Sequence, residues 1–154
     1  MRNKGIIVFA FVFVVLFVID IATKMLTDGK AMEFLPGVIS FASYRNTGIA
    51  FSMFSNAGLW LNIVTGALTV AALCVWYFLG RRDTFACVAF AVFIAGAVGN
   101  LYDRIAHGYV RDFIVTEFLP TFPVFNFADI CLTIGTILVG AYFMKASLVG
   151  GKNA

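Results

Sequence analysis

The sequence predicts an all-α membrane protein with four transmembrane helices, a small extramembrane β-sheet and an interfacial segment on the outer face. The chain has 154 residues, of which 62% are hydrophobic and 12% charged, and its mean hydropathy is +0.97. A soluble surface of this size does not tolerate such a balance. Four apolar stretches are long enough to cross a hydrocarbon core, which takes about 20 residues per helix. The length is that of one domain, residues 1–154.

The predicted spans cover residues 5–24, 59–79, 84–102 and 126–148. The first of them begins like a signal peptide, because Arg2 and Lys4 precede an apolar run. That run ends in Asp20 and Lys24 without a small-residue cleavage site. We therefore expect it to remain in the protein as a helix.

Positive charges predict the orientation in the membrane. One group lies at the termini and in the tight turn 80–83, and consists of Arg2, Lys4, Arg81, Arg82, Lys145 and Lys152. The positive-inside rule places these regions, and with them both termini, in the cytoplasm. The remaining cations, Lys24, Lys30, Arg45, Arg104 and Arg111, then lie outside, four of them within polar motifs at the membrane surface.

A net charge of +3, broken up by apolar residues, does not suggest nucleic acid as a partner.

The two outer connections, residues 25–58 and 103–125, are too apolar for solvated loops. In the first, a Leu-Pro-Gly turn at 35–37 precedes residues 38–45, whose β-branched and aromatic side chains predict a short strand of a small sheet. Phe51, Met53 and Phe54, followed by Trp60, predict a segment that lies in the headgroup region.

Carboxylates are the reactive groups that this composition favours. Cys74, Cys87 and Cys131 lie in apolar stretches without metal-site spacing, so we expect buried thiols. His107 is the only histidine, which leaves little for a Ser-His or Cys-His triad or a His-rich zinc site.

Asp112 and Asp129 lie 17 residues apart, at the two ends of a connection between the third and fourth helices. Taken singly, each acid is as well explained by a helix cap or by an ion pair with Arg111. If the connection brings them together, they would share a proton, because neighbouring carboxyls near lipid resist both being ionised. One protonated and one ionised carboxyl can polarise a carbonyl and activate water.

Further polar positions have structural alternatives. Asp20 and Lys24 lie one helical turn apart in the favoured order for an ion pair, which could also mark the membrane boundary. Residues 46–48, Asn-Thr-Gly, form either a simple turn or a binding loop. Gly96, Gly99 and Asn100 share a helix face and could serve helix packing alone. Asp103 and Arg104 could form a structural pair at the end of that helix or contact a substrate.

At these residues the chain closely resembles the lipoprotein signal peptidases, also called signal peptidase II, the aspartic membrane proteases of bacteria. The shared motifs are Asp20-x-x-Thr23-Lys24 and residues 46–51, 96–104, 110–113 and 125–129, in the family's order and spacing. The resemblance implies an aspartic endopeptidase that uses the Asp112 and Asp129 dyad and no metal or other cofactor. Its substrates would be diacylglyceryl-modified prolipoproteins, cleaved immediately before the lipidated cysteine.

The resemblance implies further properties. The residues that line or support the site would be Asp20, Lys24, Asn46, Gly48, Asn100, Asp103, Arg104 and Asn126. The protein would lie in the bacterial cytoplasmic membrane, in contact with membrane lipid, with its site toward the outer face. Globomycin-like cyclic peptides would inhibit it. Arg111 stands where the family often has an apolar residue, and beside Asp112 it could lower the pKa of that acid.

Two rival functions follow from the same residues. A divalent-metal lipid phosphotransferase would hold Mg²⁺ with oxygen ligands from Asp20, Asp103, Asp112 and Asp129. A non-enzymatic intramembrane carrier or lipid-binding protein would use the carboxylates to relay protons or to pair with a ligand. Chelation by EDTA distinguishes the first rival from a peptidase, and the second predicts no covalent change in any substrate.

Overall fold

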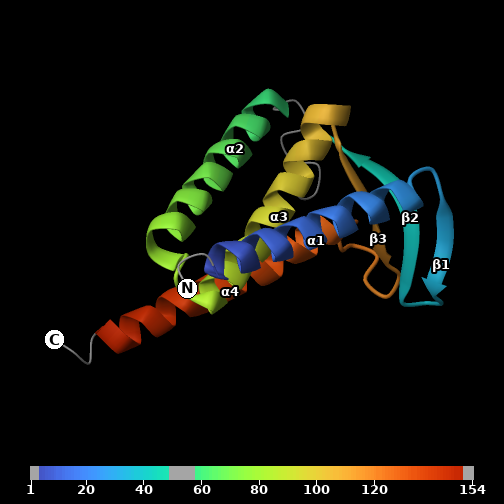
Figure 1. Cartoon of the computed structure of the whole chain (residues 1–154). Helices are drawn as coiled ribbons and strands as arrows, with labels where there is room; N and C mark the ends of the chain where they lie inside the picture. Colours follow the sequence, from blue (N-terminus) through green and yellow to red (C-terminus); the bar gives the residue numbers. More distant parts are fainter. Residues whose placement is uncertain (1–3, 49–57, 151–154) are drawn as a thin grey trace.

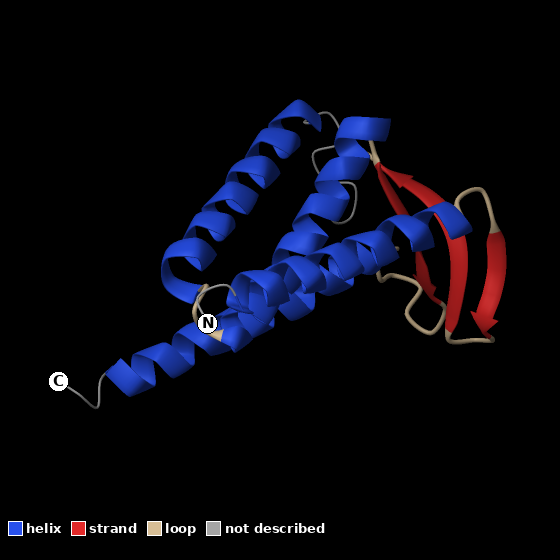
Figure 2. Cartoon of the chain, in the orientation of Figure 1, coloured by secondary structure: helices blue, strands red, loops and turns tan. Residues whose placement is uncertain are grey.

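The computed structural model describes residues 4–48 and 58–150, and its helices and strands separate into two parts (Figure 1). In chain order the elements are α1 (Lys4–Thr27), β1 (Ala31–Leu35), β2 (Ile39–Asn46), α2 (Gly58–Val75), η2 (Trp76–Gly80), α3 (Thr84–His107), β3 (Val110–Thr116) and α4 (Phe127–Gly150). The π-helical η2 continues α2. The strands form one layer at the end of the molecule where α1 finishes (Figure 2).

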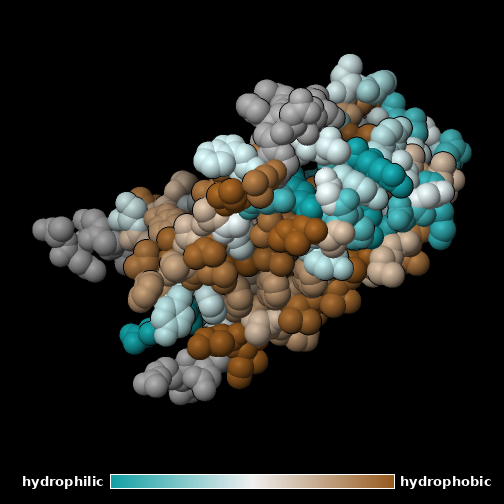
Figure 3. Space-filling view, turned by 90° about the horizontal axis from the view of Figure 1, so that it is seen from above, coloured by the Kyte–Doolittle hydropathy of each residue, from teal (hydrophilic) through white to brown (hydrophobic). Residues whose placement is uncertain are grey.

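Among the described residues, four helices are long and apolar enough to cross a membrane, as the sequence predicted: Lys4–Thr27, Leu59–Gly80, Thr84–His107 and Phe127–Leu148. In the space-filling view, hydrophobic side chains cover much of the helical body and hydrophilic ones gather at the end that carries the sheet (Figure 3). This separation is what a protein with one end outside the hydrocarbon core requires.

The third helix is longer than predicted. Asp103 and Arg104 lie beyond the predicted span but belong to α3, as their helical spacing indicated, because the helix continues to His107. Gly108 ends it in the left-handed conformation (φ 81°), where its N–H donates to the carbonyl of Arg104. At the other end, the Asp83 side chain accepts the N–H of Ala86 at 2.9 Å. Asp103 is buried within α3, and buried cations compensate its charge, as described below.

α3 is the central helix of the bundle. About 61% of its spanning window is buried, against 11–17% for the other three helices. Small residues allow its close contact with α4. A Cβ at Gly135 would lie 2.5 Å from the backbone nitrogen of Phe93, and a Cβ at Gly96 would collide with the carbonyl oxygen of Ala128. Close backbone contact of this kind holds helices together in lipid, where no hydrophobic force acts between them.

At the end away from the sheet, the bundle is closed by aromatic packing. The rings of Phe9 and Trp76 stack with centroids 3.8 Å apart, and Trp76 donates to the Cys87 thiol at 3.4 Å. Cys87 and Cys131 are buried, as expected, but Cys74 is exposed. The prediction for Cys74 was wrong because an apolar side chain on a lipid-facing helix surface does not need protein contacts.

The sheet is antiparallel, in the order β1-β2-β3. The predicted strand 38–45 is β2, whereas β1 and β3 were not predicted individually. β3 pairs with β2 so that Asp112 lies opposite Tyr44, and Val110 lies opposite Asn46. The predicted interfacial residues Phe51, Met53 and Phe54 lie outside the described residues, while Trp60 in α2 is 66% exposed.

Candidate active site

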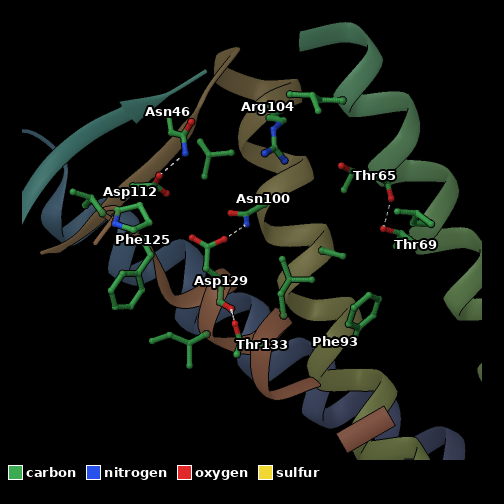
Figure 4. Close-up of a pocket in the computed structure, with 18 of the residues that line it drawn as sticks. Asn46, Thr65, Thr69, Phe93, Asn100, Arg104, Asp112, Phe125, Asp129 and Thr133 are labelled. Carbon is green, nitrogen blue, oxygen red and sulfur yellow. Dashed lines mark hydrogen bonds between the residues drawn. The ribbon is translucent and has the colours of Figure 1, made fainter. Parts of the chain in front are cut away.

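Polar side chains from β2, β3, α3 and α4 converge on one cavity of about 730 Å³ (Figure 4). They are Asn46, Asn100, Arg104, Asp112 and Asp129. The facing wall comes from α2 and includes Leu61, Val64 and Leu68. The cavity therefore combines a polar wall that holds two carboxyls with an apolar wall.

β3 positions Asp112. Alternate residues of a strand point to opposite faces, so Asp112 and Arg111 leave β3 in opposite directions. Asn46 lies two residues beyond Tyr44, the partner of Asp112 in the sheet, and therefore on the same face as Asp112. It donates from Nδ2 to Asp112 Oδ2 at 2.8 Å, and Asn126 donates from Nδ2 to Asp112 Oδ1 at 2.6 Å.

The first turn of α4 positions Asp129 through a reciprocal cap. Asn126 Oδ1 accepts the backbone N–H of Asp129 at 3.0 Å, and Asp129 Oδ2 accepts the backbone N–H of Asn126 at 3.0 Å. This is the geometry of a capping box, with Asn126 at the cap position and Asp129 three residues later. The helix dipole favours negative charge at this end. The capping interpretation of Asp129 is correct, and it also orients the carboxyl toward the cavity.

Asn126 links the two carboxyls. Its backbone N–H binds Asp129 and its side-chain Nδ2 binds Asp112. Asn100 supplies a further bond to Asp129, from Nδ2 to Oδ1 at 2.7 Å. Each of the four carboxyl oxygens thus accepts one N–H, and the amides of Asn100 and Asn126 connect the two acids through a bond of 3.1 Å.

The environment of Asp112 favours its neutral form. The residue is 3% exposed, and burial raises the pKa of its carboxyl to about 6. The negative charge of Asp129 also raises this pKa, against the hydrogen bonds from Asn46 and Asn126, which lower it. A carboxyl with a raised pKa beside a second carboxyl in the same cavity is an arrangement that can perform acid/base chemistry on water.

Arg104 reaches the same cavity from α3, one turn beyond Asn100. Its Nη2 donates to the carbonyl of Gly48 at 3.3 Å, and Gly48 N–H donates to Asn46 Oδ1 at 3.0 Å. Within the described part of the chain, its Nε is buried and has no hydrogen-bond partner. Of the two alternatives for Asp103 and Arg104, the structural pair does not form among the described residues, because neighbouring residues on a helix do not face each other.

A second group of charged residues lies beside the carboxyls, buried between α1, α3 and β3. Lys24 pairs with Asp20 at 2.8 Å and with Asp103 at 3.3 Å, and Arg111 pairs with Asp103 at 2.6 Å. Asp20 and Lys24 are 1% and 0% exposed, so they do not mark the membrane surface as the alternative interpretation had it. Arg111 binds Asp103 and not Asp112, and the expected effect of Arg111 on the pKa of Asp112 is wrong for that reason.

The described residues contain no group of three or more His, Cys, Asp or Glu side chains that could hold a metal ion. Asp20 and Asp103 are occupied by cations, and Asp112 and Asp129 by amide donors. Sequence reasoning missed the α2 wall of the cavity. Thr65 and Thr69, which line it, are four residues apart on a helix whose other polar side chain is Asn62, and that spacing was the available signal.

Comparison with known proteins gives a consistent result. A family model described as signal peptidase (SPase) II matches residues 12–145. A lipoprotein signal peptidase of Pseudomonas fluorescens is 39% identical over 144 residues, which cover 86% of this chain and 85% of that protein. One of Enterococcus faecalis is 32% identical over 127 residues, 81% of this chain and 78% of that protein.

Solved structures agree. A bacterial membrane enzyme structure obtained at 2.3 Å by the in meso method has a TM-score of 0.79 and 31% identity, covering 94% of this chain and 90% of that chain. A second, at 1.9 Å, has a TM-score of 0.77 and 32% identity, covering 93% and 94%.

Proposed function

Because this chain belongs to the signal peptidase II family, we propose that it is the aspartic endopeptidase that removes the signal peptide from diacylglyceryl-modified prolipoproteins. It cleaves immediately before the lipidated cysteine. The observation that carries the proposal is the pair of carboxyls, Asp112 and Asp129, which line one cavity and are joined by Asn126.

The proposed reaction follows from the two environments. Ionised Asp129 takes a proton from water, whose oxygen attacks the carbonyl carbon before the cysteine, while protonated Asp112 gives its proton to the carbonyl oxygen. The tetrahedral diol then collapses. Asp129 passes its proton to the cysteine nitrogen, the C–N bond breaks, and Asp112 recovers a proton as the carbonyl of the released signal peptide forms.

The other polar residues support this chemistry. Arg104 is suited to bind a backbone carbonyl of the substrate, because its guanidinium lines the cavity and its Nε has no partner within the described part of the chain. Asn46 and Gly48 hold Asp112 and the loop carbonyl that Arg104 contacts. Asn100 and Asn126 hold the two acids through the hydrogen bonds described above. Asp20, Lys24 and Asp103 form the buried charged group beside them and support the site from there.

The four spans and the family make this a bacterial inner-membrane protein. We propose the finer topology as well: both termini in the cytoplasm and the cavity toward the outer face, since Arg81 and Arg82 lie in the turn before α3 and the sheet lies at the opposite end (Figure 1). The lipid on the cysteine remains in the bilayer while the peptide enters the cavity. Globomycin-like cyclic peptides would inhibit the protein by occupying the same cavity. We also propose that residues 1–154 act as a single domain.

One assay tests the function. Purified protein is incubated with a diacylglyceryl-modified prolipoprotein in the presence and absence of EDTA. The masses of the products are then measured by mass spectrometry. We expect a free signal peptide and a fragment that begins with the lipidated cysteine, in equal yield under both conditions. Cleavage that is lost in EDTA would indicate a metal-dependent peptidase instead of an aspartic one. Uncleaved substrate under both conditions would favour the phosphotransferase or the carrier.

A further inference from the structure

Lys24 is fully buried, and its ammonium group meets three acceptors. They are Asp20 Oδ2 at 2.8 Å, Asn100 Oδ1 at 3.2 Å and Asp103 Oδ2 at 3.3 Å. An ammonium has three N–H donors and no acceptor, so the three contacts use its full capacity. Two of the contacts are ion pairs, one with Asp20 of the same helix and one with Asp103 of α3. The third contact reaches the carboxamide that binds Asp129.

The contact with Lys24 decides which way the Asn100 amide points. The oxygen and the NH₂ group of a carboxamide are nearly equal in shape, so packing alone does not distinguish the two orientations. The NH₂ group cannot face Lys24, because donor would then meet donor. Asn126 Nδ2 is a second donor on the same oxygen, at 3.1 Å. Asn100 Nδ2 is therefore left to face Asp129 Oδ1, at 2.7 Å.

A turned amide would change the donors at both acids. Its oxygen would face the Asp129 carboxylate, acceptor against acceptor, and the acid would lose its Asn100 bond. Asn126 Nδ2 would also lose the Asn100 oxygen that helps to hold it. Since the same Nδ2 donates to Asp112 at 2.6 Å, the second carboxyl would lose its fixed partner too.

We propose that Lys24 is a positioning residue for the reaction, because it holds the Asn100 amide in the orientation that donates to Asp129 and steadies the Asn126 bond to Asp112. The inference rests on the proposed function. It differs from a purely structural role, in which Lys24 would only join α1 to α3 and the geometry at the acids would not depend on it.

A double-mutant cycle separates the two roles. The full-length protein is purified as the parent, Lys24→Met, Asn100→Ala and the combined variant, and kcat and KM are measured with the lipidated prolipoprotein below every melting temperature. We expect Lys24→Met to lower kcat at least about tenfold and to change KM less than about threefold. Because Lys24 acts through Asn100, adding Lys24→Met to Asn100→Ala should cost less than about a further twofold. If the two losses multiply, the inference is wrong.

Arg111→Gln is the matched control. It removes another cation of the same buried group, and within the described part of the chain the Arg111 side chain bonds only to Asp103. We expect a lower melting temperature and unchanged kcat. An equal fall of kcat in Arg111→Gln and Lys24→Met would overturn the inference, because general loosening would then explain both.

Lys24→Met leaves Asp20 buried without its cation, so it could fail to fold. In that case the double variant Asp20→Asn/Lys24→Met is compared with the single variant Asp20→Asn. Neither of these two proteins carries the Asp20 charge, so the loss of Lys24 leaves no unpaired carboxylate at that position. The same tenfold difference in kcat is expected, and equal rates would reject the inference. A parent protein that cleaves nothing would reject the proposed function itself.

Discussion

At the scale of single residues, amides determine what each carboxyl can do. Asp129 receives N–H donors from Asn100 and from the backbone of Asn126, at the positive end of α4. Asp112 receives its donors from the side chains of Asn46 and Asn126, without a helix terminus. This difference is the physical basis for the proposed roles, with Asp129 as the base and Asp112 as the acid.

The first prediction is that Asp112→Asn and Asp129→Asn each abolish cleavage and leave folding intact. An amide keeps the shape of the acid but can neither take the water's proton nor pass one on. Turnover below about a tenth of the parent's, a loss of more than about 1.4 kcal/mol in transition-state stabilisation, is expected for both. Either variant that folds with normal yield and exceeds this rate would exclude its residue from the dyad.

The second prediction concerns stability and pH. Burial raises the pKa of Asp112 from 3.8 to about 6, so the folded protein prefers the neutral acid. Stability is therefore unaffected by this group below about pH 4 and falls as pH rises through about pH 6, by a total on the order of 3 kcal/mol. Relative to the parent, Asp112→Asn should gain in melting temperature between about pH 4 and pH 8. Melting curves that keep a constant offset over this range would contradict the assignment.

The third prediction is that Arg104→Ala and Asn46→Ala slow the enzyme without silencing it. Each removes a polar bond to the substrate or to Asp112, which costs about 10- to 100-fold, whereas the acids carry the chemistry itself. Residual turnover should exceed that of the Asp112 and Asp129 variants. Arg104→Ala should melt near the parent, since in the described residues its single hydrogen bond is to Gly48. If Arg104→Ala turned over substrate at the parent's rate, Arg104 would have no role in substrate binding.

At the scale of elements, the contact between α3 and α4 sets the position of Asp129. α4 begins with Asn126 and Asp129 and packs closely on α3, which carries Asn100. Gly96 and Gly135 allow this contact, because a Cβ at either position would collide with the backbone of the other helix. Any separation of the two helices would lengthen the bond between Asn100 and Asp129.

The fourth prediction uses two glycines of α4. A Cβ at Gly135 would lie 2.5 Å from the backbone of Phe93, whereas nothing lies within 4 Å of a Cβ at Gly140. Gly135→Ala should therefore destabilise the protein by about 1–3 kcal/mol. Gly140→Ala should be neutral or stabilising by up to about 1 kcal/mol, because alanine favours the helix. Thermal melting in one detergent compares them, and equal shifts would show that the close contact does not hold.

At the scale of the whole molecule, the cavity joins a polar wall at the sheet end to an apolar wall on α2. A substrate whose cysteine is held in the bilayer by lipid needs to move only laterally to reach such a cavity. The anchor concentrates the peptide and fixes its register against the acids.

The fifth prediction is that the lipid is required. The unlipidated precursor, otherwise identical and at equal concentration, should remain uncleaved where the diacylglyceryl form is processed. Mass measurement of both reactions in the same detergent provides the comparison. Similar rates for the two forms would indicate a general membrane protease. They would also show that the lipid anchor does not position the substrate at the site.

Sequence reasoning alone predicted the four spans, favoured carboxylates over cysteine and histidine chemistry, and identified the two acids as candidates. Those inferences depend on local properties: span length, residue type and spacing along one helix. The predicted ends of α1, α2 and α4 are close to those observed for the same reason. The sequence also predicted one strand, because β2 carries its own β-branched and aromatic pattern.

The hydrogen-bond and ion-pair partners of each charged side chain could be found only from the folded structure. Arg111 adjoins Asp112 in sequence but leaves the opposite face of β3, so it binds Asp103. Arg104 adjoins Asp103 but contacts Gly48, and Lys24 reaches Asn100, 76 residues away. Hydrogen bonds and ion pairs act over a few ångströms in space, and the packing of α1, α3, α4 and the sheet determines which side chains come within that distance.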